Sequence, residues 1–132
     1  MQPDLPVPGT AEQWLKRARG NLLRAKAEKP EGSYFEDFCF DAQQAAEKAI
    51  KAIFIHFGIE FRYVHDLGEL IISLESNGID VPDSVRVSAE LTYYAVETRY
   101  PGVFEPVTKD EYEQAVNIAE TVLNWAEGII YE

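Results

Sequence analysis

The sequence predicts an all-helical fold, an up-and-down antiparallel bundle of four main helices and one short helix. Apolar residues recur at steps of three and four along most of the chain, which is the spacing of one helical face. No segment alternates apolar and polar residues for long enough to predict a strand. Four capping residues are each followed three positions later by Glu or Gln, the pattern that starts a helix. They are Thr10 with Gln13, Ser33 with Glu36, Asp66 with Glu69, and Thr108 with Glu111.

The first helix is expected to begin at Thr10, after a flexible arm of residues 1–9 that contains three prolines. A single domain then spans residues 10–132. The apolar face of this helix comprises Trp14, Ala18, Leu22 and Ala25. Pro30 and Gly32 end the helix. Six Lys and Arg residues make it the most basic part of the chain, which indicates either a solvated face or a docking face for an acidic partner.

The second helix is expected to run from Ser33 to Gly58, a length of about 37 Å at 1.5 Å per residue. One apolar stripe comprises Phe38, Ala42, Ala45, Ala49, Ala52 and Ile53. Four further apolar residues lie outside this stripe: Phe40, Ile50, Phe54 and Ile55. A helix that is apolar on two sides must be buried on two sides. We therefore predict that these four residues contact a second copy of the chain; the alternative is that a loop of the same chain covers them.

Three more helices are expected after an extended connector at residues 59–65. The short one begins after Asp66 and ends at Asn77-Gly78. The next starts near Pro82 and stops at residues 99–102, where Arg-Tyr-Pro-Gly disfavours helical geometry. The last begins after Thr108 and ends near Ile130.

Composition and charge limit the classes of function. Among 132 residues, 23 acidic and 12 basic side chains give a net charge of -11, which repels phosphate backbones and argues against nucleic-acid binding. The single cysteine, Cys39, excludes an internal disulfide and an all-cysteine zinc site, and its apolar neighbours indicate a buried, inert thiol. No signal peptide or membrane-length apolar run is present, so a cytoplasmic protein without membrane contact is expected.

No motif for catalysis, for a metal or for a cofactor is found. Glycine-rich phosphate loops and a nucleophile elbow are absent from the sequence. The two histidines are too far apart for a shared metal site. His56 falls near the apolar side of the second helix and is expected to be a core or interface residue. His65 is expected to fix the connector by hydrogen bonding, with a proton-carrying role as the alternative.

A row of polar residues on the second helix is a candidate binding site. Its members are Asp41, Gln44, Lys48 and Lys51, spaced three, four and three positions apart, so they project along one side. Glu47 can pair with Lys51 one turn later. Arg99, at the end of a later helix, could clamp a phosphate or carboxylate, or pair with Asp41. Such a row is also typical of a border between core and water.

Three segments together resemble the HEPN family (higher eukaryotes and prokaryotes nucleotide-binding). They are FDAQQAAEKAIKA at residues 40–52, HDLGEL at 65–70 and YAVETRYP at 94–101. The motifs occur in the family's order, and the likeness extends over about residues 12–130.

The resemblance implies a helical bundle that dimerises and that is often encoded beside a minimal nucleotidyltransferase, in a toxin–antitoxin-like pair. If a nucleotide binds, Lys48, Lys51 and Arg99 would face its phosphates and Tyr100 would stack on its base, while Asp41 and Gln44 orient these groups. Some family members are metal-independent ribonucleases that use an arginine followed, after four to six residues, by a histidine. No arginine in this sequence stands at that distance before a histidine.

We therefore predict a non-catalytic, homodimeric interaction module that partners a nucleotidyltransferase and binds nucleotide. The alternative is a ribonuclease that brings His65 to Arg99 or Arg62 through the fold. An adaptor with no ligand is a third interpretation.

Overall fold

The computed structural model describes residues 9–61, 64, 66–96 and 106–131. These residues form helices and connecting turns and no strand, which confirms the predicted fold class. The elements in chain order are α1 (Ala11–Ala25), α2 (Phe35–His56), α3 (Leu67–Ser76), α4 (Asp83–Arg86), the 3-10 helix η1 (Val87–Leu91), α5 (Thr92–Val96) and α6 (Lys109–Ile130).

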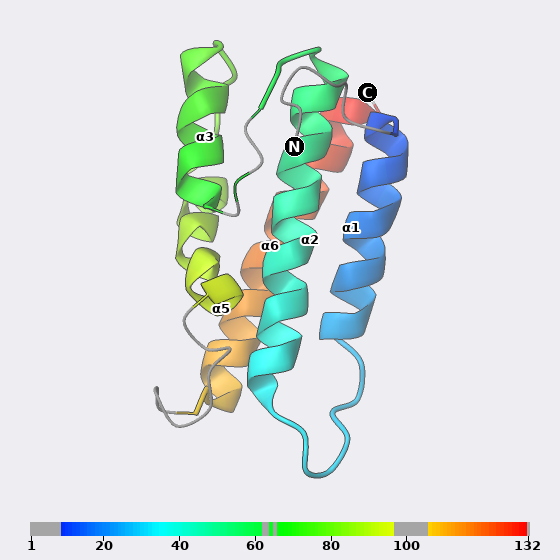
Figure 1. The fold of residues 1–132 in the computed structure, drawn as a ribbon, viewed down its shortest axis with the longest axis vertical. Helices are drawn as coiled ribbons and strands as arrows, with labels where there is room; N and C mark the ends of the chain where they lie inside the picture. Colours follow the sequence, from blue (N-terminus) through cyan, green and yellow to red (C-terminus); the bar gives the residue numbers. More distant parts are fainter. Residues whose placement is uncertain (1–8, 62–63, 65, 97–105, 132) are drawn as a thin grey trace.

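Helix α2 lies at the centre of the bundle. It packs against α1 and α6, and also against α3, η1 and α5 on its other side (Figure 1). Helix α1 runs antiparallel to α6, as two ion pairs show. Arg19 pairs with Glu127, whereas Lys26, just after the end of α1, pairs with Glu120, seven residues before Glu127 on α6. Part of the basic face of α1 is therefore paired with acidic residues of α6 in the same chain.

Helix α1 begins where the sequence predicts. The Thr10 side chain accepts a hydrogen bond from the Gln13 amide at 3.1 Å, and the Gln13 side chain accepts one from the Thr10 amide at 2.9 Å. Ala18, Leu22 and Ala25 are buried as predicted, whereas Trp14 is only half-buried at the edge of the core. The first eight residues of the predicted arm lie outside the described residues.

The start of α2 differs from the prediction. The N-cap is Tyr34, and no side chain caps the helix there. The Ser33 hydroxyl instead donates to the Pro30 carbonyl oxygen at 2.6 Å, so the predicted capping box with Glu36 is wrong. The Ser33 hydroxyl is already hydrogen-bonded within the turn at Pro30, so it does not cap the helix. The end is as expected, because Gly58 follows with φ of +67°, a conformation that favours glycine.

The second side of α2 is covered largely by its own chain. Ile50 and Phe54 are fully buried without any second subunit, so the inference that these two side chains need a partner copy is wrong. The Phe61 ring of the connector packs on Phe54, with centroids 5.2 Å apart. Phe40 and Ile55 are half-buried, and their assignment to a dimer interface stays a prediction.

Helix α3 matches the prediction, whereas the expected fourth main helix is divided into α4, η1 and α5. Asp66 caps α3 by accepting from the Glu69 amide at 3.2 Å. In the next stretch, Val85, Ser88 and Leu91 are buried at intervals of three residues. Within η1, three residues per turn place Ser88 and Leu91 directly in line, whereas on an α-helix these two positions would be offset by about 60°.

Helix α6 closes the bundle with a complete capping box. The Thr108 hydroxyl accepts from the Glu111 amide at 3.1 Å, and the Thr108 amide donates to the Glu111 carboxylate at 2.9 Å. Ala115, Ala119 and Val122 of this helix are buried in the core. In the described part of the chain, no helix is long and apolar enough to cross a membrane.

Candidate functional site

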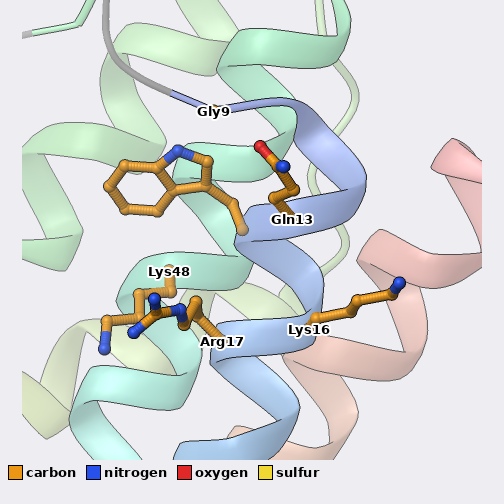
Figure 2. A pocket seen from close by; sticks show the side chains of 6 residues that line it. Gly9, Gln13, Lys16, Arg17 and Lys48 are labelled. Carbon is orange, nitrogen blue, oxygen red and sulfur yellow. The ribbon is translucent and has the colours of Figure 1, made fainter.

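A pocket of about 550 Å³ lies between α1 and α2, near the start of α1. Its lining residues are Gly9, Gln13, Trp14, Lys16, Arg17 and Lys48. Figure 2 shows Arg17 and Lys48 side by side, while Lys16 extends away from them on the other side of α1. Of the predicted site residues, Lys48 lines this pocket.

The positive charges of Arg17 and Lys48 affect each other. Burial lowers the pKa of the Lys48 ammonium, the neighbouring guanidinium of Arg17 lowers it further, and Glu47 and Asp41 act in the opposite direction. Among the described residues, none that lines the pocket is acidic. The pocket is therefore a cationic site in a chain that carries a net charge of -11.

A polar network fixes Lys48 between α1 and α2. Its ammonium donates to the Asn21 side-chain oxygen at 2.7 Å, and the Asn21 amide nitrogen donates to Asp41 at 3.1 Å. Arg24 approaches the same Asp41 oxygen at 3.6 Å. Asp41 is thus satisfied by groups on α1, and Arg99, its predicted alternative partner, lies outside the described residues.

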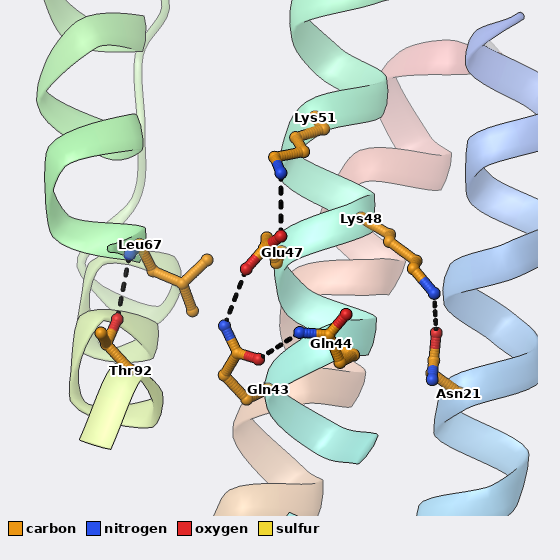
Figure 3. Close-up of polar contacts among 8 residues, drawn as sticks. All are labelled: Asn21, Gln43, Gln44, Glu47, Lys48, Lys51, Leu67 and Thr92. Atoms are coloured by element: carbon orange, nitrogen blue, oxygen red, sulfur yellow. Dashed lines mark hydrogen bonds and ion pairs between the residues drawn. The ribbon is translucent and has the colours of Figure 1, made fainter. Parts of the chain in front are cut away.

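A second network lies on a neighbouring side of α2, directed away from α1. Lys51 donates to Glu47 at 2.8 Å, Gln43 donates to Glu47 at 2.9 Å, and Gln44 donates to Gln43 at 2.8 Å (Figure 3). The Glu47–Lys51 pair that the spacing predicted is present, with side chains only 4% and 7% exposed. The Lys51 ammonium also lies 5.6 Å from the centre of the Phe61 ring.

The structure therefore does not bring the predicted row together as one site. Figure 3 shows Lys48 directed toward α1 and Lys51 directed away from it. Lys51 is buried with its counter-ion and has little surface to offer a ligand. Arg99 and Tyr100 lie outside the described residues.

Two pocket residues, Trp14 and Arg17, were missed as site residues. The helical spacing assigned Trp14 to the core face, and Arg17 was one of six basic residues on a face expected to be solvated or docked. The available signal was their separation of three positions on a helix, which places an aromatic ring and a guanidinium on neighbouring parts of one face.

The described nucleophiles and bases do not form a catalytic cluster. Cys39 is fully buried, as expected, and burial, followed by Glu36 and Glu111, raises the pKa of its thiol to about 12, which disfavours the thiolate. His56 is exposed in the last turn of α2 against the Phe57 ring, so its expected place in the core is wrong, whereas a place in an interface stays a prediction. His65 lies outside the described residues. Among the described residues, no group of three or more metal-ligating side chains is found.

Comparison with known proteins identifies the family. The family model described as HEPN domain matches residues 11–129. The chain belongs to the HEPN family. The crystal structure of an archaeal HEPN homologue is similar to this HEPN chain, with a TM-score of 0.74 and 30% sequence identity over 93% of this chain and 99% of that one. A search of curated proteins found no match.

Proposed function

We propose that this HEPN protein is a non-catalytic interaction module that acts in the cytoplasm as a homodimer, partners a minimal nucleotidyltransferase in a toxin–antitoxin-like pair, and binds nucleotide. The observation that carries the proposal is a HEPN match over residues 11–129 in a sequence without the arginine–histidine spacing of the family's ribonucleases. A chain without the arginine and histidine that such ribonucleases use lacks that pair for moving protons in cleavage, which supports a role in binding.

Apolar surface at the C-terminal part of α2 supports the homodimer. Ile55 is half-buried, and Phe57, just after the helix, remains 46% exposed. Phe40, nearer the start of α2, is also half-buried. Contact with a second copy would remove this apolar surface from water, which favours association by about 25 cal/mol per Å².

Nucleotide binding is proposed at the Lys48 end of the predicted row. Lys48 lines the pocket, and its ammonium donates a hydrogen bond to Asn21. Asn21 in turn donates a hydrogen bond to Asp41, so this network fixes the position of the ammonium. Gln44, Arg99 and Tyr100 remain candidate contributors, whereas the buried ion pair of Lys51 makes it the weakest member of the set.

Analytical ultracentrifugation of the purified protein, alone and mixed with the minimal nucleotidyltransferase of the same genome, tests the assembly. The proposal expects a species of twice 15.0 kDa alone and a heavier complex with the enzyme. Ile55→Glu should shift the protein alone toward monomer. Ile72→Glu is the matched control, because Ile72 is a 64% exposed isoleucine on α3, away from α2. A monomer at all concentrations and no complex with the enzyme would refute this function.

A further inference from the structure

The pocket between α1 and α2 has the size of a small-molecule site. Its volume of about 550 Å³ lies within the range of roughly 300–1,000 Å³ that is usual for ligand pockets. It is formed by two rigid elements, since Trp14 and Arg17 belong to α1 and Lys48 belongs to α2. Helix α1 and helix α2 pack against each other along their length, so the spacing between the three side chains is fixed by the bundle (Figure 1).

Neither Arg17 nor Lys48 forms an ion pair with a carboxylate among the described residues, although Glu47 and Asp41 act on the Lys48 ammonium from farther away. Lys16 lies 3.9 Å from Glu12, but Arg17 has no ion-pair partner among the described residues. The hydrogen-bond acceptor of Lys48 is the neutral side-chain oxygen of Asn21. An ammonium has three N–H donors, so this contact leaves two of them for another acceptor. Two neighbouring positive charges of this kind repel each other, and an anion placed between them would relieve that repulsion.

Hydrogen bonds with buried residues fix the position of the Lys48 ammonium. Asn21 is only 8% exposed and bridges the Lys48 ammonium and the Asp41 carboxylate, which is itself 8% exposed. A lysine on a solvated face would move among many rotamers, whereas this network holds the ammonium at the pocket. Pre-organisation of this kind lowers the entropy lost when a ligand binds.

An aromatic ring lies beside the cations. The half-buried side chain of Trp14, three positions before Arg17 on α1, lines the same pocket as Arg17 and Lys48. Indole faces stack with flat ring systems, and a guanidinium binds phosphate oxygens in a bidentate manner. The same pocket therefore offers a surface for a flat ring and donors for a phosphate.

We propose that the pocket formed by Trp14, Arg17 and Lys48 binds a nucleoside monophosphate, with the phosphate on Arg17 and Lys48 and the base against Trp14. This assignment rests on the nucleotide-binding part of the proposed function and gives it a site, but it does not depend on the homodimer or on the partner enzyme. Arg17 and Trp14 thereby replace Lys51 in the set that contacts the ligand.

Titration of the ¹⁵N-labelled protein with AMP, followed by NMR, tests the site. The indole N–H signal of Trp14 is assigned with the Trp125→Phe variant, since the chain has two tryptophans. AMP is expected to shift the Trp14 signal and to bind at least about tenfold more weakly to Arg17→Gln and to Lys48→Gln, as for loss of a charge-assisted hydrogen bond. Inorganic phosphate and adenosine alone should each bind more weakly than AMP.

The matched control is Lys26→Gln, which removes a cation of the α1 region that pairs with Glu120 at 3.2 Å, outside the pocket. Its AMP affinity should equal that of the wild-type protein, and circular dichroism should show all variants folded. AMP binding that leaves the Trp14 signal and both pocket variants unchanged overturns this site while nucleotide binding stands. Equal binding of AMP and inorganic phosphate overturns the role of Trp14. No binding of AMP at millimolar concentration removes both the site and the nucleotide-binding part of the proposed function.

Discussion

Glu47 and Lys51 form an ion pair that is almost completely enclosed by the bundle, with side chains 4% and 7% exposed. Taking charges out of water is costly, and the attraction within the pair and its hydrogen bonds offset that cost only while both partners are present. Gln43 donates a further hydrogen bond to Glu47, and Lys51 faces the Phe61 ring. The pair therefore holds the Lys51 ammonium beside the Phe61 ring.

Replacing Glu47 with glutamine should destabilise the protein by about 3–5 kcal/mol, because it leaves the Lys51 ammonium buried without a counter-ion. Urea denaturation measures the loss as a lower midpoint. Glu12→Gln is the matched control: it breaks a pair with the same spacing, Glu12 with Lys16, that is largely exposed, and it should cost about 0–1 kcal/mol. Equal effects of the two substitutions would contradict the buried pair.

The pKa of Cys39 predicts a pH dependence of stability. Below about pH 9 the thiol is protonated in both the folded and the unfolded chain. As the pH rises above 9, the unfolded chain loses this proton while the folded chain, with a pKa of about 12, keeps it, so the free energy of unfolding falls. The burial of Tyr94, whose pKa is also raised to about 12, adds a decline of the same sign only above about pH 10.

Urea denaturation at pH 8, 9 and 10 checks this dependence. The wild-type protein should lose stability between about pH 9 and 10, and Cys39→Ala should lose less over the same interval, because alanine has no proton to release. Parallel pH profiles of the two proteins would show that the thiol is not shielded from water.

At the level of the helices, the N-termini of α6 and α2 provide a direct test of capping. Thr108→Ala removes the reciprocal hydrogen bonds at the start of α6 and should cost about 1 kcal/mol of stability. Ser33→Ala removes one exposed hydrogen bond to Pro30 and no helix cap, so its effect should stay within about 0.5 kcal/mol. Thermal denaturation of the two variants compares them; a larger loss for Ser33→Ala would refute the assigned caps.

Helix positions could be predicted from the sequence where the signal was local. Thr10, Asp66 and Thr108 cap their helices by bonds to residues three positions away, and these contacts depend on the neighbouring backbone alone. The division of the fourth helix could not be predicted, because its three-residue spacing of buried positions emerges from packing against α6 and α3. The covering of Ile50 by its own chain likewise depends on where the connector and α3 return.

For the whole molecule, the register between α1 and α2 decides where the site lies. The spacing on one helix predicted that Lys48 and Lys51 share a side, but three positions on a helix differ in direction by about 60° (three steps of about 100°). That difference directs Lys48 to α1 and Lys51 to the connector. The antiparallel packing of α1 and α2 determines which residues of α1 lie next to Lys48. These residues are some 30 positions from Lys48 in the sequence, so the pattern within one helix cannot predict the contact.

Charge distribution follows the same packing. Arg19 on α1 and Lys26 just after it pair with glutamates of α6, whereas no described carboxylate lines the pocket of Arg17 and Lys48. This pocket is thus locally cationic in a chain with a net charge of -11, which is consistent with binding of a small anion rather than of a long nucleic acid.

The central claim, that this HEPN protein acts by binding and not by catalysis, is tested most directly by incubating it with labelled RNA in the absence of metal from pH 5 to pH 9. The account predicts that the RNA stays intact over the whole range, because no arginine–histidine pair with ribonuclease spacing is present. RNA cleavage by the wild-type protein that is abolished in the His65→Ala variant would contradict it.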